Sequence, residues 1–315
     1  MKPRTAVIIA SAASLNFTYS PLYMRLKTIE GILSRANYNF YTLSVKDFLK
    51  KPNNHQVDLG VILSFTNSWV APFLKQFSKR VWLDAMDSKS TLELTQSRSY
   101  IKQKITNARD SFGAMHLFDL VTYISQEDRK NEQGTYRSSV EYVFPIELKE
   151  LPTLNVSPTR NFVFVGPSKY RPNLDAVKLL DKMMKQNEII APIKICGIGY
   201  SEINYRWHDL LQFDGFVDEK QLYSSSDVHL APLRSGAGIK MKSVMPFALG
   251  LQVIGTRIAF NGLQKHSNLI ELENVEELPQ YMKAIDSFPK VRIPNGKEIY
   301  VCDESLPLIR ELLNF

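Results

Sequence analysis

Cysteine is scarce in this sequence, and this scarcity limits the chemistry that the chain can perform. The 315 residues include two cysteines, Cys196 and Cys302, and five histidines that are scattered along the chain. Two cysteines so far apart in sequence form neither a disulfide framework nor a metal site. The sequence therefore predicts a cytoplasmic protein whose site holds no metal ion.

Long apolar runs are also missing. No segment approaches the ~20 consecutive apolar residues of a transmembrane helix. The run AVIIASAA at residues 6–13 follows a basic start, as it would in a signal peptide, but it is short and continues directly into polar NFTYS. We therefore expect this run to form a first buried strand.

The chain has the composition of a globular protein, with 44% hydrophobic and 23% charged residues and no low-complexity tract or repeat. A domain size of ~150 residues predicts two domains. Residues 1–150 carry 20 Lys/Arg and 14 Asp/Glu, whereas the remainder carries 19 and 18. The basic N-terminal half indicates either an anionic partner (a membrane surface, a lipid diphosphate or nucleic acid) or a solvated basic surface. The basic segment at residues 98–109 is open to the same two interpretations.

The first half alternates short apolar runs with amphipathic stretches, which is typical of a parallel sheet covered by helices. A helix is expected at Leu22–Ser34. The expected strands are Thr5–Ala10, Tyr38–Leu43, Leu59–Phe65, Arg80–Leu83, Leu117–Ser125 and Val140–Phe144.

A linker is expected at Glu147–Thr159, which has two prolines and little periodicity, and the alternation restarts after it. The expected strands of the second half are Asn161–Val165, Ile193–Gly197, Val228–Pro232 and Gln252–Gly255. The expected helices are Asp175–Gln186, Glu219–Ser224, Lys240–Leu249 and Val275–Ser287. We predict an α/β fold of two Rossmann-like doubly wound domains, at residues 1–150 and 151–300, facing across a cleft. Residues 301–315 are expected to form a helix that packs back on the N-terminal domain.

The most informative stretch is Ser226–Gly262. A buried strand leads into a loop of small residues and then into a helix that opens with Lys240 and Lys242. Glycines allow a ligand close to the backbone, a helix N-terminus carries partial positive charge, and two lysines add full charges. These features together predict a diphosphate site. The alternative is a tight strand–helix turn with a solvated lysine pair.

The same stretch resembles the donor-binding segment of family 4 glycosyltransferases of the GT-B fold. The matching residues are Gly215-Phe216-Val217, Pro232-Leu233-Arg234, Gly236-Ala237-Gly238-Ile239-Lys240, Lys242, Ala248, Gly250, Val253 and Gly255-Thr256. A second family segment resembles Phe164-Val165-Gly166, Tyr170-Arg171-Pro172-Asn173 and Asp175-Ala176. The resemblance covers roughly residues 161–262. It implies a UDP- or GDP-sugar as donor, no bound cofactor, retention of anomeric configuration and no required metal.

One departure from the family pattern concerns the donor helix. The glutamate that holds the ribose hydroxyls in the family falls on Met245 here, and Pro246 follows it. Three interpretations are open: other groups hold the ribose, the donor chemistry differs, or the chain is an inactive subunit that only binds.

Particular roles follow for several residues. Lys240 and Lys242 would neutralise the donor diphosphate and stabilise the leaving nucleotide. Asp87, at the end of a strand in the N-terminal half, is the candidate for accepting the acceptor hydroxyl's proton, or else a helix cap, whereas Asp84 is expected to be structural. The predicted donor-binding residues are Gly166, Arg171, Asn173, Arg234, Gly236, Ala237, Gly238, Ile239, Lys240, Lys242 and Met245.

The leading hypothesis is a hexosyltransferase that builds a surface polysaccharide or similar glycan on a glycan or lipid-linked acceptor, at the cytoplasmic face of a membrane. Two alternatives remain: a glucosyltransferase acting on modified DNA, and a non-catalytic GT-B subunit of a glycosyltransferase complex. DNA binding would weaken steeply with salt, and sugar transfer by the isolated chain would contradict the non-catalytic alternative.

Overall fold

The computed structural model describes residues 4–11, 21–50, 56–86, 112, 118–132, 134–138, 140–143, 151–236 and 238–291. The chain divides into two compact units between Leu148 and Lys149. Several predictions lie outside the described residues: the roles of Asp87 and Ala237, the basic segment at residues 98–109 and the terminal helix at residues 301–315.

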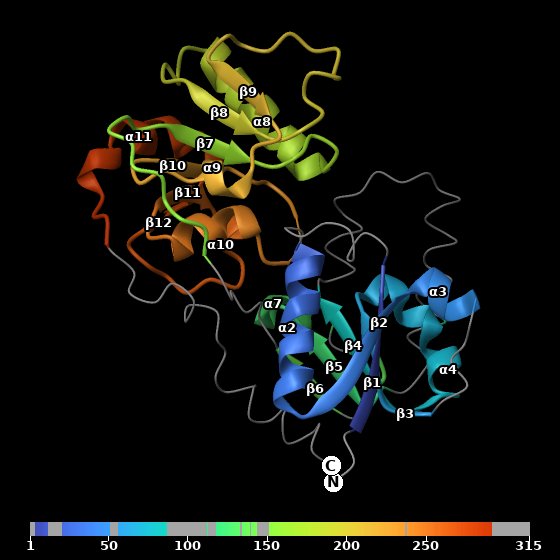
Figure 1. Ribbon diagram of the computed structural model, residues 1–315. Helices are drawn as coiled ribbons and strands as arrows, with labels where there is room; N and C mark the ends of the chain where they lie inside the picture. The colour runs from blue at the N-terminus through green and yellow to red at the C-terminus, as the bar shows by residue number, and fades with distance from the viewer. Residues whose placement is uncertain are drawn as a thin grey trace. The chain divides into compact units, whose positions relative to one another are not determined.

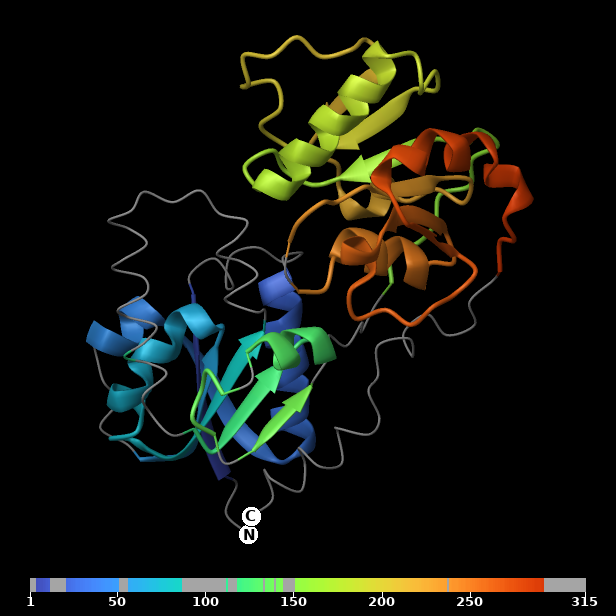
Figure 2. The same cartoon turned by 180° about the vertical axis from the view of Figure 1, so that it is seen from behind.

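The N-terminal unit is built on a six-stranded parallel sheet with the order β2-β1-β3-β4-β5-β6 (Figures 1 and 2). Its strands are β1 (Arg4–Ala10), β2 (Tyr38–Ser44), β3 (Val57–Leu63), β4 (Ser78–Met86), β5 (Leu120–Tyr123) and β6 (Glu141–Val143). Its helices are α2 (Pro21–Arg35), α3 (Val45–Lys50), η1 (Phe65–Val70), α4 (Ala71–Leu74) and α7 (Gln126–Asn131).

Apolar residues on both faces of this sheet explain its doubly wound arrangement. One cluster joins α2, through residues such as Leu26 and Ile29, to Ile8 and Val61 of the central strands. A second cluster joins α3, η1 and α4 to the residues that alternate with those, such as Ile9 and Ile62. Because successive residues of a strand point to opposite faces, continuous apolar runs such as β1 require cover on both sides.

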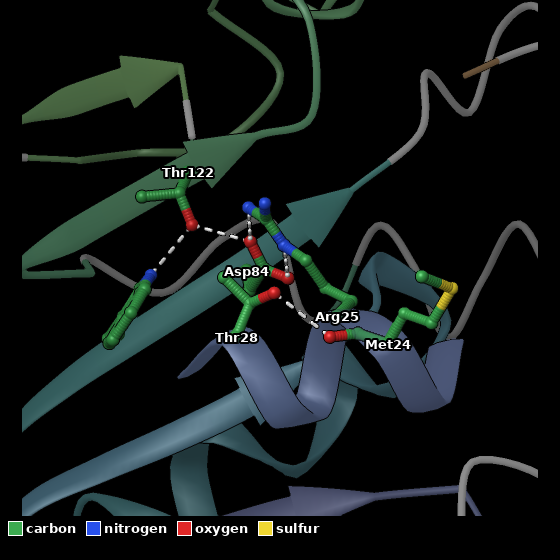
Figure 3. Close-up of polar contacts among 6 residues, drawn as sticks. Met24, Arg25, Thr28, Asp84 and Thr122 are labelled. Carbon is green, nitrogen blue, oxygen red and sulfur yellow. Dashed lines mark hydrogen bonds and ion pairs between the residues drawn. The ribbon is translucent and has the colours of Figure 1, made fainter. Parts of the chain in front are cut away.

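A buried polar network crosses the first of these layers (Figure 3). The Arg25 guanidinium on α2 binds both carboxylate oxygens of Asp84, with Nε–Oδ2 and Nη2–Oδ1 distances of 2.8 and 2.5 Å. Thr122 donates its hydroxyl to Asp84 Oδ1 at 2.6 Å and accepts the indole N–H of Trp82. All four side chains are fully buried. Asp84 is therefore structural, as its position in the sequence indicated.

The C-terminal unit repeats this architecture with the order β12-β11-β10-β7-β8-β9, again all parallel (Figure 1). Its strands are β7 (Phe162–Val165), β8 (Ile193–Cys196), β9 (Leu211–Gly215), β10 (Val228–Ala231), β11 (Gln252–Thr256) and β12 (Leu269–Leu272). Its helices are α8 (Arg171–Lys185), α9 (Glu219–Leu222), α10 (Met241–Ala248), η2 (Arg257–Phe260), η3 (Val275–Glu277), α11 (Leu278–Lys283) and η4 (Ile285–Ser287).

Several expected boundaries were wrong. The strand expected at Leu59–Phe65 ends at Leu63, because the chain turns sharply at Ser64 into η1. The helix expected from Asp175 begins at Arg171, because Pro172 occupies a first-turn position, where a proline needs no backbone donor. The single helix expected at Val275–Ser287 is divided into η3, α11 and η4. Strands β9 and β12 were not predicted.

His229, in the central strand β10, makes the unit sensitive to acid. Its ring is buried against that of Tyr223, and within the described part of the chain neither ring nitrogen has a hydrogen-bond partner. Desolvation lowers the pKa of His229 to about 3. The unfolded chain, with a histidine pKa of about 6.5, therefore binds the proton first as the pH falls.

We expect His229 to contribute stability that is fully present above about pH 6.5 and is lost as the pH falls, at about 1.4 kcal/mol per pH unit, until about pH 3. Burial raises the pKa of Asp227, which works in the opposite direction, so the informative quantity is the difference from a variant. Urea unfolding of the wild type and His229→Phe between pH 7 and pH 5 measures it. Equal pH dependence of the two proteins would contradict the prediction.

Candidate anion-binding site

Three chain segments meet at the carboxyl-terminal edge of the second sheet, after strands β7, β8 and β10. Gly166, which follows β7, donates its N–H to the carbonyl of Cys196 and accepts the Tyr200 hydroxyl at 3.1 Å. Gly197, which follows β8, lies so close that a Cβ there would be 2.1 Å from the Gly166 carbonyl oxygen. The segments after β7 and β8 are therefore packed backbone against backbone.

The loop between β10 and α10 lies against the same segment. Gly236 has a φ of 132°, a conformation that favours glycine, and a Cβ there would approach Lys240 Cε and the Tyr170 hydroxyl at 3.0 and 3.1 Å. The Lys240 ammonium donates to the carbonyl of Gly238 at 2.6 Å, and the residue is 6% exposed. The loop thus holds a cation directly before the first residue of α10.

Lys242, in the first turn of α10, reaches across to the segment after β7. Its ammonium donates to Oδ1 of Asn173 and lies 4.6 Å from the centre of the Phe164 ring. Asn173 is fixed in turn, because its amide group donates to the carbonyl of Pro167 at 3.0 Å. Desolvation, followed by the repulsion of Lys240, lowers the pKa of Lys242 to about 7.

This arrangement suits an anion with several oxygens. Two lysine ammonium groups and the start of an eight-residue helix lie at one sheet edge, beside glycines whose missing side chains allow close approach. The positive charge of Lys240 adds to desolvation in lowering the pKa of Lys242. A phosphate or diphosphate would relieve that repulsion, so the site has the electrostatic character of a phosphate-binding site.

The two predicted arginines are engaged elsewhere. Arg171 pairs with Asp175 at 2.8 Å, and Arg234 pairs with Glu276 at 2.7 Å, both on exposed surface. Ile239 and Met245 are buried and apolar, and Met245 is 4% exposed. The structure therefore brings together Gly166, Asn173, Gly236, Gly238, Lys240 and Lys242, and it places Met245 in the packed part of α10.

The sequence did not indicate three residues that pack against this site. Gly197 and Tyr200 contact the backbone of Gly166, and the ring of Phe164 lies beside the Lys242 ammonium. The Gly197-Ile198-Gly199 pattern after a buried strand was the available signal. Cys196, expected in a buried strand, does lie in β8, where burial raises the pKa of its thiol to about 12. A thiol so protonated is a poor nucleophile.

Gly197→Ala is expected to destabilise the protein by about 1–3 kcal/mol, because the new Cβ collides with backbone atoms that cannot move independently of Gly166. Urea unfolding measures the change. Gly215→Ala is the control: it also introduces a Cβ at a strand end, where no atom lies within 4 Å, so only the cost of its positive φ is expected. A smaller loss for Gly197→Ala than for Gly215→Ala would contradict the prediction.

Two features are absent from the described residues. None of the described helices is long and apolar enough to cross a membrane. The described part of the chain also contains no group of three or more His, Cys, Asp or Glu side chains that could hold a metal ion.

Comparison with known proteins identifies the fold. No family model and no curated protein matches the sequence. Among solved structures, the chain is similar to TarM (TM-score 0.55, 11% identity, covering 85% of this chain and 57% of that one). It is also similar to the pneumococcal O-GlcNAc transferase GtfA in complex with UDP and GlcNAc (0.51, 15% identity, 85% and 59%).

A third similar structure is AviGT4, a glycosyltransferase involved in avilamycin A biosynthesis (TM-score 0.50, 9% identity), in which the match covers 99% of this chain and 97% of that one. The chain spans less than two thirds of the length of TarM and GtfA. These likenesses show a GT-B fold, with two Rossmann-like domains, as predicted.

Proposed function

We propose that the protein is a glycosyltransferase, similar to family 4, whose C-terminal unit binds a nucleotide-sugar donor. The observation that supports this most directly is the pair Lys240 and Lys242, held with Asn173 and Gly166 at the carboxyl-terminal edge of a parallel sheet. Ligands of open α/β sheets bind at this edge. The GT-B fold gives independent support, and GtfA, which shares it, was solved with UDP and GlcNAc.

In this proposal the two lysines neutralise the donor diphosphate and stabilise the negative charge that develops on the leaving nucleotide. Transfer proceeds with retention and without a metal, and Asp87 accepts the proton of the acceptor hydroxyl. The acceptor is a glycan or lipid-linked glycan of a polysaccharide pathway, met in the cytoplasm or at the inner face of the membrane. The excess of basic residues in the N-terminal half supports an anionic acceptor or membrane surface.

A non-catalytic subunit is the second candidate, and Met245 favours it. The side chain is buried and apolar at the position where family 4 enzymes have a ribose-binding glutamate. In that case the chain would bind a nucleotide or glycan for a catalytic partner without transferring sugar. Transfer to DNA remains a further alternative and would show itself by binding that weakens steeply with salt.

Calorimetric titration of UDP and then GDP into the wild type and Lys240→Ala tests the proposal. We expect one nucleotide to bind and the variant to lose most of that binding. Lys182→Ala is the matched control, because Lys182 is an exposed lysine in the last turn of α8, away from the helix's first turn. Saturation at about a hundred times the dissociation constant should also stabilise the wild type by about 2.7 kcal/mol in thermal unfolding.

The outcomes separate the alternatives. Binding that is lost in Lys240→Ala and kept in Lys182→Ala supports a donor site, and incubation with the matching nucleotide-sugars then separates an enzyme, which releases nucleotide, from a binding subunit. If neither nucleotide binds the wild type, the donor site is refuted.

A further inference from the structure

The two lysines of the candidate anion-binding site are held in different ways. Lys240 is buried, and its ammonium donates to the carbonyl of Gly238 at 2.6 Å, directly before the first residue of α10. Because a backbone carbonyl of the loop holds it, this ammonium places a positive charge at a defined position. Lys240 therefore acts as the fixed cation of the site.

Lys242 has surroundings that suit an uncharged amine. Its Nζ lies 4.6 Å from the centre of the Phe164 ring, and its acceptor is Oδ1 of Asn173, a neutral amide rather than a carboxylate. Desolvation and then the charge of Lys240 lower the pKa of Lys242 to about 7. At pH 7 about half of the molecules therefore carry a neutral amine here, and a neutral amine is a nucleophile.

Glycines leave both nitrogen atoms uncovered on one side. A Cβ at Gly166 would lie 2.9 Å from Nζ of Lys242, and a Cβ at Gly236 would lie 3.5 Å from Nζ of Lys240. Any side chain at these two positions would therefore cover the amines. Lys242 is itself half-buried, so a small molecule can reach it.

A ligand that joins an anionic group to an electrophilic carbon would use both lysines. Its anionic group would bind at Lys240 and the start of α10, which favours negative charge. The carbon would then meet the amine of Lys242. Acyl phosphates fit best, because their leaving group is the phosphate itself, and Lys240 stabilises the charge that develops on it.

We propose that Lys242 is a modification site that acyl phosphates acylate, and that its acylation blocks the anion-binding site. The lone pair of the amine attacks the acyl carbon, and the bond from that carbon to the phosphate oxygen breaks. Phosphate leaves with the electron pair and takes up the proton that the nitrogen loses, so the products are an amide and inorganic phosphate. The amide carries no charge, so the site loses one of its two cations. That this loss regulates sugar transfer rests on the proposed function, whereas the acylation does not.

Incubation of the full chain with acetyl phosphate, followed by peptide mass spectrometry, measures the rate at each lysine. Lys182, an exposed lysine in the last turn of α8, is the reference within the same molecule. At about pH 7.5 a lysine with an ordinary pKa is neutral in only about one molecule in a thousand. We expect Lys242 to be acetylated at least about tenfold faster than Lys182.

A second reagent separates guidance by the phosphate from mere reactivity of the amine. The N-hydroxysuccinimide ester of acetic acid transfers the same acetyl group but carries no phosphate. Lys240→Ala should slow acetylation of Lys242 by acetyl phosphate about tenfold more than acetylation by the ester, because it removes a charged partner of the phosphate. Inorganic phosphate should slow the reaction of acetyl phosphate at Lys242 and leave that at Lys182 unchanged.

Two results would overturn the proposal: acetyl phosphate acetylates Lys242 no faster than Lys182, or Lys240→Ala slows the two reagents equally. Titration of UDP and GDP into the untreated and the acetylated protein keeps the two proposals apart. Rapid acetylation of Lys242 in a protein that binds neither nucleotide would refute the donor site and leave the modification site standing. Nucleotide binding without preferential acetylation would do the reverse. Nucleotide affinity that is unchanged by acetylation of Lys242 would show that the modification does not block the site.

Discussion

Replacement of Lys242 by methionine is expected to weaken nucleotide diphosphate binding by about 10- to 100-fold, because it removes a charge-assisted hydrogen bond to phosphate. Methionine keeps the length of the side chain over the Phe164 ring but leaves Oδ1 of Asn173 without its donor. Titration calorimetry with the nucleotide that binds the wild type measures the change. Lys182→Met, at the far end of α8, should bind as the wild type does.

The pH dependence of nucleotide binding tests whether Lys242 is the group that binds the phosphate. With a pKa of about 7, the ammonium of Lys242 is already protonated in the free protein at lower pH and loses its proton as the pH rises above that value. A bound diphosphate favours the charged form, so binding above pH 7 must take up a proton. Affinity should therefore fall by up to about tenfold per pH unit above pH 7 and change little just below it.

Lys242→Arg supplies the control, since a guanidinium stays charged throughout this range. Its nucleotide affinity should be nearly constant between pH 7 and pH 9, whereas that of the wild type falls. Equal affinity of the wild type at the two pH values would show that Lys242 is charged in the free protein and would contradict the prediction.

In the C-terminal unit, the sequence predicted the interior of the sheet better than its edges. Central strands such as β1 and β10 are buried on both faces and appear as continuous apolar runs. The edge strands β9 (LQFDG) and β12 (LIEL) have buried residues that alternate with exposed ones, and they are only five and four residues long. An alternation over four or five residues is too short to distinguish a strand from a loop, because it does not establish a hydrophobic period.

The part of the candidate site whose residues lie close together in the sequence could be predicted. Gly236, Gly238, Lys240 and Lys242 lie within seven residues, and their strand–loop–helix order is a recognisable pattern. The partner of Lys242 is Asn173, 69 residues away, and its contact depends on the order of β7 and β10 in the sheet. The positive φ of Ser64, 75°, could not be predicted, because serine has no preference for that conformation.

The buried pair of Arg25 and Asp84 leads to the largest expected loss of stability. Asp84→Ala should lower the free energy of unfolding by about 3–5 kcal/mol, because it removes the carboxylate that binds the buried Arg25 guanidinium. Thr122 also loses the acceptor of its hydroxyl. Urea unfolding, followed by circular dichroism, measures the change. Lys79→Ala is the control: it breaks an ion pair whose lysine is 66% exposed and should cost less than about 1 kcal/mol.

The double variant Arg25→Met/Asp84→Leu separates the cost of an unpaired charge from the contribution of the pair. It removes both charges and fills the space with apolar atoms, so it should be more stable than Asp84→Ala. If the double variant had the same free energy of unfolding as Asp84→Ala, the ion pair itself would provide the stability, and the buried charge of Arg25 would not explain the loss in Asp84→Ala.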